Sequence, residues 1–308
     1  MYAPVALFGY NRPLHLQRAI EALRNNPESP ETDLFVFVDG PKSHDQATDA
    51  IQMCRDLALS ISGFRNVTTH IQEENLGLAN SIRFGVATVL EKNDSIIVIE
   101  DDIVLSPKGL QFLNEGLVRY EKETQISSIH AYQYPIRQKF DECVLLRGAD
   151  CWGWATWKDR WASTTFDSEK LRDLILEQDL ELEFDLDGSM QYLAMLDNQT
   201  NGKIDSWAIC WHASMFLQNR FTVFPPKPLA ANIGTDGSGS HAGAHDIFKV
   251  LVSQDSKWIF PNKIEESTSY RQAMIEFYRE NMPRANIVIR LLRVLSGLFR
   301  PHRNFKNG

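Results

Sequence analysis

The stretch 96-IIVIEDD-102 joins four aliphatic residues, Ile96 to Ile99, to three adjacent acids, Glu100, Asp101 and Asp102. A short run of mostly β-branched residues is typical of a strand that is buried on both faces of a sheet. The acids then fall at the carboxyl end of this strand, which is where open α/β sheets bind their ligands. The stretch therefore predicts a parallel sheet with negative charge gathered at its functional edge.

Three neighbouring carboxylates repel one another unless a cation lies among them. Carboxylate oxygens select hard divalent ions such as Mg²⁺ and Mn²⁺, and these ions in turn hold phosphate groups. The triplet of Glu100, Asp101 and Asp102 therefore points to an enzyme that handles a nucleoside diphosphate compound through a metal. The alternative interpretation is an exposed acidic turn.

Strand and helix patterns alternate on both sides of this stretch. Such a β-α-β-α-β-α-β series predicts an α/β fold with a mostly parallel, Rossmann-like central sheet and helices on both faces. The predicted strands cover residues 5–8, 34–38, 66–71, 96–99, 126–131 and 221–224, and the predicted helices begin at Pro13 and cover 45–60, 78–90 and 108–123.

Composition narrows the class of protein. The 308 residues carry a net charge of −8, which argues against a general nucleic-acid binder. The cysteines Cys54, Cys143, Cys151 and Cys210 are scattered without a CxxC pair, which favours reduced thiols in a cytoplasmic protein. Neither a leader peptide nor an apolar stretch long enough to cross a bilayer is expected.

The last residues differ from the acidic body of the chain. Segment 284–306 holds six Arg or Lys residues and no acid, and its apolar residues fall mostly on one side of a helical wheel. A basic amphipathic helix of this kind can lie on an anionic membrane, which would make the protein peripheral on the inner face of the plasma membrane. The alternative is a terminal helix that docks on the protein's own core.

Polar loops follow three of the predicted parallel strands. Tyr10 and Arg12 follow the first strand, Asp39 follows the second, and the acid triplet follows the fourth. Because the carboxyl ends of parallel strands share one edge, we expect these loops to converge. Arg12 can pair a phosphate through two hydrogen bonds, and Asp39 can accept hydrogen bonds from a base or a ribose. A surface salt bridge and a simple Asp-Gly turn are the respective alternatives.

With these residues in place, the chain resembles glycosyltransferases of the GT-A fold, and most closely the N-acetylglucosaminyltransferase I type. That family has Glu-Asp-Asp after a Val/Ile run, as at residues 100–102, and an arginine after its first strand, as at Arg12. It also has an aspartate that contacts the nucleotide, to which Asp39 is similar.

Three later motifs extend the resemblance in the same order to about residue 245. Gly153-Trp154 resembles the family's Gly-Trp segment behind the acceptor site. Asp205-Ser206-Trp207 resembles its Asp-Asp-Trp, although Ser206 replaces the second acid. The loop 237-GSGSH-241 resembles its late Gly- and Ser-containing loop that ends in Ser-His.

The resemblance implies a metal-dependent inverting transfer of a hexose or N-acetylhexosamine from a UDP-sugar to a hydroxyl of a glycan or lipid-linked glycan. Asp102 would hold Mn²⁺ or Mg²⁺, while Glu100 and Asp101 would hold the ribose and sugar or support the metal's waters. Asp205 would be the catalytic base, with Asp150 as a reserve candidate.

The resemblance leaves two further points open. Trp154 and Trp207 are either sugar-stacking residues or core fillers. His241 is either a ligand of metal or phosphate or a plain loop histidine.

The animal family carries an N-terminal membrane anchor that this sequence lacks, so a bacterial enzyme of surface polysaccharide (lipopolysaccharide or capsule) synthesis is expected. Residues 1–104 would be the nucleotide-sugar-binding half, 105–248 the acceptor-binding half and 249–308 a helical extension. Two alternatives remain: a nucleotidyltransferase that makes the sugar nucleotide, for which 9-GYNRP-13 is a poor loop, and a non-catalytic glycan-binding protein on a degenerate transferase fold.

Overall fold

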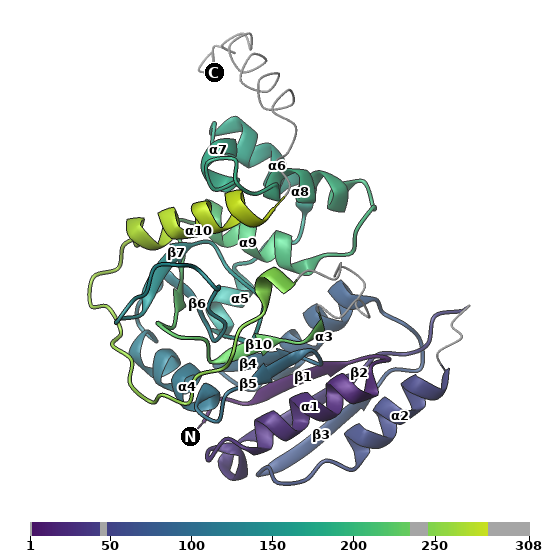
Figure 1. Cartoon of the computed structure of the whole chain (residues 1–308). Helices are drawn as coiled ribbons and strands as arrows, with labels where there is room; N and C mark the ends of the chain where they lie inside the picture. The colour runs from purple at the N-terminus through teal and green to yellow at the C-terminus, as the bar shows by residue number, and fades with distance from the viewer. Residues whose placement is uncertain (1, 44–47, 235–245, 283–308) are drawn as a thin grey trace.

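The computed structural model describes residues 2–43, 48–234 and 246–282, and one eight-stranded sheet organises this part of the chain (Figure 1). The strand order is β3-β2-β1-β4-β8-β6-β9-β7. Its parallel half contains β1 (Val5–Gly9), β2 (Asp33–Val38), β3 (Asn66–Ile71) and β4 (Ser95–Glu100). The predicted α/β fold with a mostly parallel central sheet is confirmed.

The second half of the sheet is mixed. β8 (Trp154–Trp157) is antiparallel to both β4 and β6 (Ile126–His130). β9 (Phe221–Phe224) runs parallel to β6, and β7 (Val144–Arg147) closes the edge antiparallel to β9. A separate two-stranded sheet pairs β5 (Ile103–Leu105) with β10 (Ala230–Asn232).

Helices cover both faces of the parallel strands (Figure 1). One face packs against α1 (Pro13–Arg24), α2 (Thr48–Leu59) and α4 (Gly109–Arg119). The other face packs against α3 (Leu78–Leu90), which itself contacts α9 (Trp207–Leu217). The short helices η1 (Ser29–Glu31) and η3 (Asp246–Phe248) lie in connections.

The remaining helices gather away from the parallel strands. α6 (Ser168–Glu177), α7 (Glu181–Phe184) and α8 (Tyr192–Thr200) share a small apolar core with α9, as Figure 1 shows in its upper part. α5 (Lys158–Ala162) directly follows β8, and α10 (Thr268–Asn281) packs against β7. Apart from α10, which falls within the helical extension predicted for 249–308, the sequence patterns did not predict these helices, because several are short and α9 is apolar almost all round.

β4 is buried on both faces, as its aliphatic run predicted. Ile97 and Ile99 join the core under α1 and α4, whereas Ile96 and Val98 join the core under α3. Burial of these side chains stabilises the strand by roughly 1.5–3 kcal/mol per residue. The strand that ends in the acid triplet is therefore held rigidly in the middle of the sheet.

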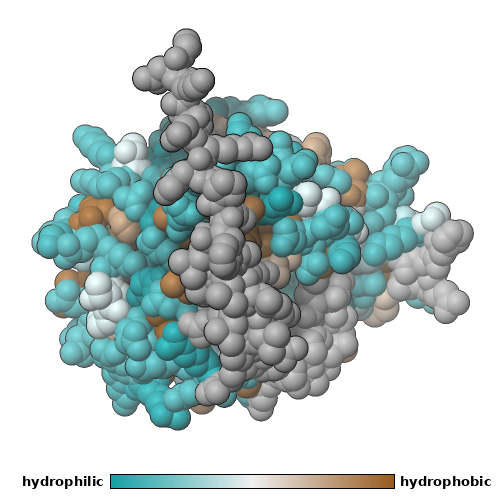
Figure 2. Space-filling view, turned by 90° about the horizontal axis from the view of Figure 1, so that it is seen from above, coloured by the Kyte–Doolittle hydropathy of each residue, from teal (hydrophilic) through white to brown (hydrophobic). Residues whose placement is uncertain are grey.

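The visible face in Figure 2 is mostly hydrophilic, and its brown residues form small separate groups. None of the described helices is long and apolar enough to cross a bilayer. The predicted basic helix at 284–306 lies outside the described residues, and the division at residues 104 and 248 stays a prediction.

The close packing of α3 on the sheet gives a stability test. A Cβ at Gly85 would lie 2.5 Å from Phe8 Cε1 and 3.1 Å from Phe37 Cδ2, and these two rings are stacked. We expect Gly85→Ala to lower the free energy of unfolding by about 1–3 kcal/mol, because overpacking outweighs the better helix propensity of alanine. Urea denaturation measures this change.

A substitution at Ala87, an exposed position on the same helix, measures the effect of helix propensity alone on the free energy of unfolding. Ala87→Gly should cost only about 1 kcal/mol, because its side chain packs against nothing rigid. A Gly85→Ala protein that is more stable than wild type would contradict the packing argument.

Candidate active site

The carboxyl ends of β1, β2 and β4 bring the predicted polar loops to one edge of the sheet. These three strands are parallel neighbours, so Tyr10 and Arg12 after β1, Asp39 after β2 and Glu100 at the end of β4 all lie there. Pro13 starts α1 directly after Arg12, and its fixed φ suits the first helical position. The convergence expected from the strand pattern is therefore confirmed.

Arg12 is bound to two members of the acid triplet. Its Nη2 donates to Asp101 Oδ1, and its Nε donates to Asp101 Oδ2 at 3.4 Å. The same Nη2 also donates to Asp102 Oδ2 at 3.0 Å. Asp101 is only 4% exposed, so its carboxylate has lost its hydrogen bonds to water. The two hydrogen bonds from Arg12 compensate for this loss.

Burial and like charge shape the electrostatics of this cluster. Burial raises the pKa of the Asp101 carboxyl to about 6, although Arg12 opposes the shift. Burial, together with the charges of Asp102 and Asp101, also raises the pKa of Glu100. Burial alone would lower the pKa of Arg12, but the attraction of Asp101 and Asp102 raises it above its ordinary value. Arg12 therefore stays a cation.

Gly234 closes over the pair formed by Arg12 and Asp102. β10 leads into this position, and the Ile233 N–H donates to the Asp102 carbonyl oxygen at 2.8 Å. A Cβ at Gly234 would lie 2.4 Å from Asp102 Oδ2 and 3.0 Å from Arg12 Nη1, so only glycine fits without a shift. No local pattern could have identified this residue, since its contacts are more than 130 positions away in the sequence.

Asp39 anchors the loop that leads into α3. Its Oδ1 accepts from the N–H groups of Gly40 and Leu76, and its Oδ2 accepts from Asn75 Nδ2 and the Gly77 N–H, all within 3.1 Å. A carboxylate offers about four lone-pair positions, and these bonds use them. The structure thus gives Asp39 an anchoring role, and the nucleotide contact expected for it stays a prediction.

Asp205 lies at the start of α3. The Ala79 N–H donates to its Oδ2 at 3.3 Å, and a Cβ at Gly77 (φ +78°) would lie 2.9 Å from that same oxygen. The residue is exposed, and its neighbour Ser206 caps α9. Because α3 begins at the edge where β3 ends, Asp205 lies at the same edge of the sheet as the acid triplet.

Trp154 and Trp207 belong to a buried aromatic cluster. Their rings stack at 5.3 Å, and Trp161 and Trp211 lie 5.8 and 5.6 Å from Trp154. Neither Trp154 nor Trp207 is more than 2% exposed. A sugar-stacking role for either ring therefore has no support in the structure; they fix α9 against β8 instead. Trp157 and Trp161 are also packed in the core.

The segment that precedes β8 borders the acid triplet. β8 begins at Trp154, which pairs with Val98 near the end of β4, so residues 150–153 lie close to this end. Asp150 accepts from Tyr134 Oη and from the Cys151 N–H, each at 2.7 Å. Burial, Asp150, Glu100 and Asp102 all raise the pKa of the Cys151 thiol, as expected for a group close to the triplet.

Trp152 was not predicted as a site residue, and its indole is partly buried. Its ring packs edge-on against Tyr132 at 4.8 Å and Phe248 at 5.3 Å. The sequence places Trp152 only two residues before Trp154, but it does not show which of these two indoles is buried. The structure shows that Trp154 is buried and Trp152 is partly exposed. His241 lies outside the described residues.

The residues present fit a divalent cation in one specific way. Within the described ranges, no three His, Cys, Asp or Glu side chains form a metal site by themselves. Mg²⁺ commonly binds one or two carboxylates and completes its shell with substrate phosphates and water. Asp102 offers such a carboxylate, because its side chain is 17% exposed whereas that of Asp101 is 6% exposed.

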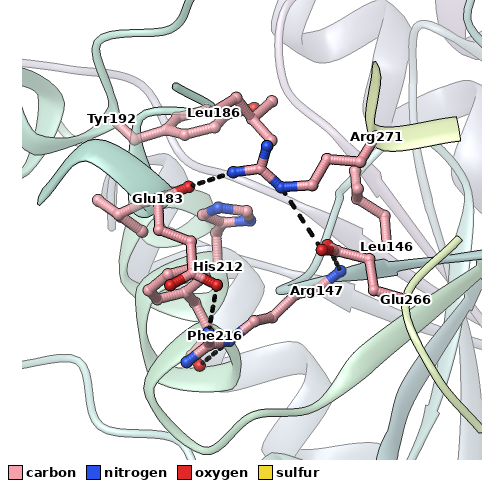
Figure 3. A pocket seen from close by; sticks show the side chains of 10 residues that line it. Leu146, Arg147, Glu183, Leu186, Tyr192, His212, Phe216, Glu266 and Arg271 are labelled. Atoms are coloured by element: carbon pink, nitrogen blue, oxygen red, sulfur yellow. Dashed lines mark hydrogen bonds and ion pairs between the residues drawn. The ribbon is translucent and has the colours of Figure 1, made fainter. Parts of the chain in front are cut away.

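A small cavity of about 20 Å³ lies elsewhere, between β7, α7, α9 and α10 (Figure 3). Arg147 pairs with Glu183 at 2.8 Å, and Arg271 pairs with Glu266 at 3.4 Å, so charged groups in its wall neutralise one another. None of the predicted site residues lines it. We interpret this cavity as part of the packing between the helices and the sheet edge.

His130 supports the backbone of Trp152 and gives a pH test. Its Nε2 accepts the Trp152 N–H at 3.0 Å, and burial lowers its pKa. A histidine whose folded pKa is lowered stabilises the fold less as pH falls below its unfolded pKa of about 6.5. We therefore expect the stability of wild type relative to His130→Gln to decrease between pH 7.5 and 5, by at most about 1.4 kcal/mol per pH unit.

Denaturation of both proteins at several pH values measures this difference, in which the titrations of Glu100 and Asp101 cancel. Glutamine keeps an acceptor for the Trp152 N–H but has no proton to gain. A difference that does not change with pH would contradict the neutral, buried state of His130.

Comparisons with known proteins find similarity among solved structures. No protein-family model and no curated protein matches the chain. Among solved structures, a crystal structure of S. aureus TarS is similar over 47% of this chain and 25% of that chain, with 14% identity and a TM-score of 0.31. Another, of S. aureus TarS 1–349, is similar over 77% of this chain and 62% of that chain, with 12% identity and a TM-score of 0.41. This chain therefore spans less than two thirds of either structure, and likenesses of this extent leave its chemistry to be argued from its own residues.

Proposed function

We propose that this protein is a metal-dependent glycosyltransferase of the GT-A fold, similar to the N-acetylglucosaminyltransferase I type, which transfers a hexose or N-acetylhexosamine from a UDP-sugar to a glycan hydroxyl. The observation that carries the proposal is the cluster of Arg12, Asp101 and Asp102 at the carboxyl edge of parallel strands. A guanidinium next to a partly exposed carboxylate offers a cation for phosphate and a ligand for a metal.

Each group at this edge has a role in the proposed reaction. Asp102 would hold Mn²⁺ or Mg²⁺, which supplies Lewis-acid stabilisation of the departing diphosphate. Arg12 would donate hydrogen bonds to the phosphate oxygens as negative charge develops on them. Asp101 would hold Arg12 in place, since it binds both Nε and Nη2.

Asp205 is the proposed general base. It lies at the N-terminus of α3, where the Ala79 N–H donates to its Oδ2 and leaves its other oxygen available to a substrate. Asp205 would take the proton of the acceptor hydroxyl while that oxygen forms a bond to the anomeric carbon. The bond from this carbon to the diphosphate breaks on the opposite face, so the anomeric configuration is inverted.

Neither alternative function is favoured by a specific contact in the structure. The acceptor is proposed to be a glycan or lipid-linked glycan of surface polysaccharide synthesis. The membrane contact of 284–306 and the roles of His241 and Glu100 in binding remain part of the same proposal.

Substitution of the base tests the mechanism. Asp205→Asn keeps an oxygen for the Ala79 N–H but cannot take a proton, so we expect kcat to fall by about 10²–10⁴ with little change in the KM for the donor. Asp173→Asn, at an exposed position on α6, is the matched control and should keep wild-type activity. Undiminished turnover by Asp205→Asn would remove this residue from the reaction.

Ligand-induced stabilisation tests the substrate class. A UDP-sugar with Mn²⁺ at about 100 times its Kd should stabilise the fold by about 2.7 kcal/mol and raise Tm by several degrees. EDTA and the variant Asp102→Asn should both remove this shift. A shift with nucleoside triphosphates and release of pyrophosphate would favour the nucleotidyltransferase, and a metal-independent shift with glycans alone would favour the binding protein.

A further inference from the structure

We infer that Arg12 is a built-in counter-ion that competes with a divalent cation for Asp102 and transfers to the diphosphate when the cation binds. The inference rests on the proposed function and assigns a regulatory step to the same site. It would make the affinity for metal depend on whether a nucleotide is present.

The two contacts of Arg12 are unequal. Asp101 receives hydrogen bonds from both Nε and Nη2 and is almost fully buried. Asp102 receives only one, from Nη2 at 3.0 Å, and its side chain is more exposed. Arg12 can therefore release Asp102 while it keeps Asp101, so a small movement of the guanidinium is sufficient.

Arg12 holds an oxygen of Asp102 that could also bind a cation. Asp102 Oδ2 accepts from Arg12 and also faces Gly234, where a Cβ would lie 2.4 Å away. The nitrogen Nη1 of Arg12 faces Gly234 as well, at 3.0 Å from the same Cβ position. Arg12 and Gly234 thus lie on two sides of this oxygen, and a divalent ion bound to it would take the place of the guanidinium.

Charge explains why the diphosphate completes the exchange. A divalent ion beside Asp102 repels the Arg12 guanidinium, which is held as a cation by its partners. The negative charge of a diphosphate removes this repulsion and offers Arg12 new acceptors. Binding of the metal and of the nucleotide should therefore be positively coupled beyond their direct contact with each other.

Mn²⁺ binding measured by electron paramagnetic resonance, with and without UDP, tests the inference. We expect Arg12→Gln to bind Mn²⁺ alone about tenfold more tightly than wild type, because the competitor is gone. We also expect Arg12→Gln to bind UDP more weakly than wild type does, because a phosphate contact is lost. Opposite signs for the two ligands are not produced by a general loss of folding.

Arg18→Gln is the matched control, since it removes the same charge from an exposed position on α1, the helix that directly follows Arg12. It should leave both affinities within about twofold of wild type. Mn²⁺ affinity in Arg12→Gln that is equal to or weaker than in wild type would overturn the inference while leaving the proposed function standing. Absence of Mn²⁺ binding to wild type, even with UDP, would overturn both.

A second measurement uses the unaltered chain in case Arg12→Gln does not fold. A crystal structure of wild type with Mn²⁺ and UDP should show Arg12 Nη2 farther than about 3.5 Å from Asp102 Oδ2 and within hydrogen-bond distance of a phosphate oxygen. An intact bond between Arg12 and Asp102 beside a bound Mn²⁺ would overturn the inference.

Discussion

The pairing of Arg12 with Asp101 is the interaction on which the geometry of the candidate site depends. Neither charge can be buried alone without a cost of several kcal/mol, so each fixes the other at the end of its strand. The bond joins residues 89 positions apart and ties the loop after β1 to the loop after β4. Asp102 is thereby left at the surface of the pair, where it can meet a ligand.

The pairing of Arg12 with Asp101 can fix the geometry of the site because the strands that carry both residues are rigidly packed. β4 is packed on both faces, and its partner β8 carries Trp154 into the indole cluster that also holds the start of α9. Asp39 adds a third fixed point by binding the loop that precedes α3, against whose first turn Asp205 rests. The acids, the arginine and the proposed base therefore all stand on elements whose positions are set by core packing.

Sequence patterns predicted the first half of the fold well, because β1, β2 and β4 are short apolar runs and the helices between the strands have apolar faces. They also predicted that Arg12, Asp39 and the triplet share an edge. They did not predict that Asp39 is bound mainly by the loop before α3, that Trp154 and Trp207 are buried, or that Gly234 lies against Asp102. These features depend on contacts between distant segments, and α9 lacked periodicity because most of its sides are buried.

The indole cluster also has an optical consequence. Trp161, Trp207 and Trp211 lie with ring centroids between 5.3 and 5.8 Å from that of Trp154, close enough for their electronic transitions to mix. Such exciton coupling gives a paired band in circular dichroism whose sign and size depend on the mutual angles of the rings. Circular dichroism of the unlabelled protein should therefore report changes in how α9, the helix that follows Asp205, packs on the sheet.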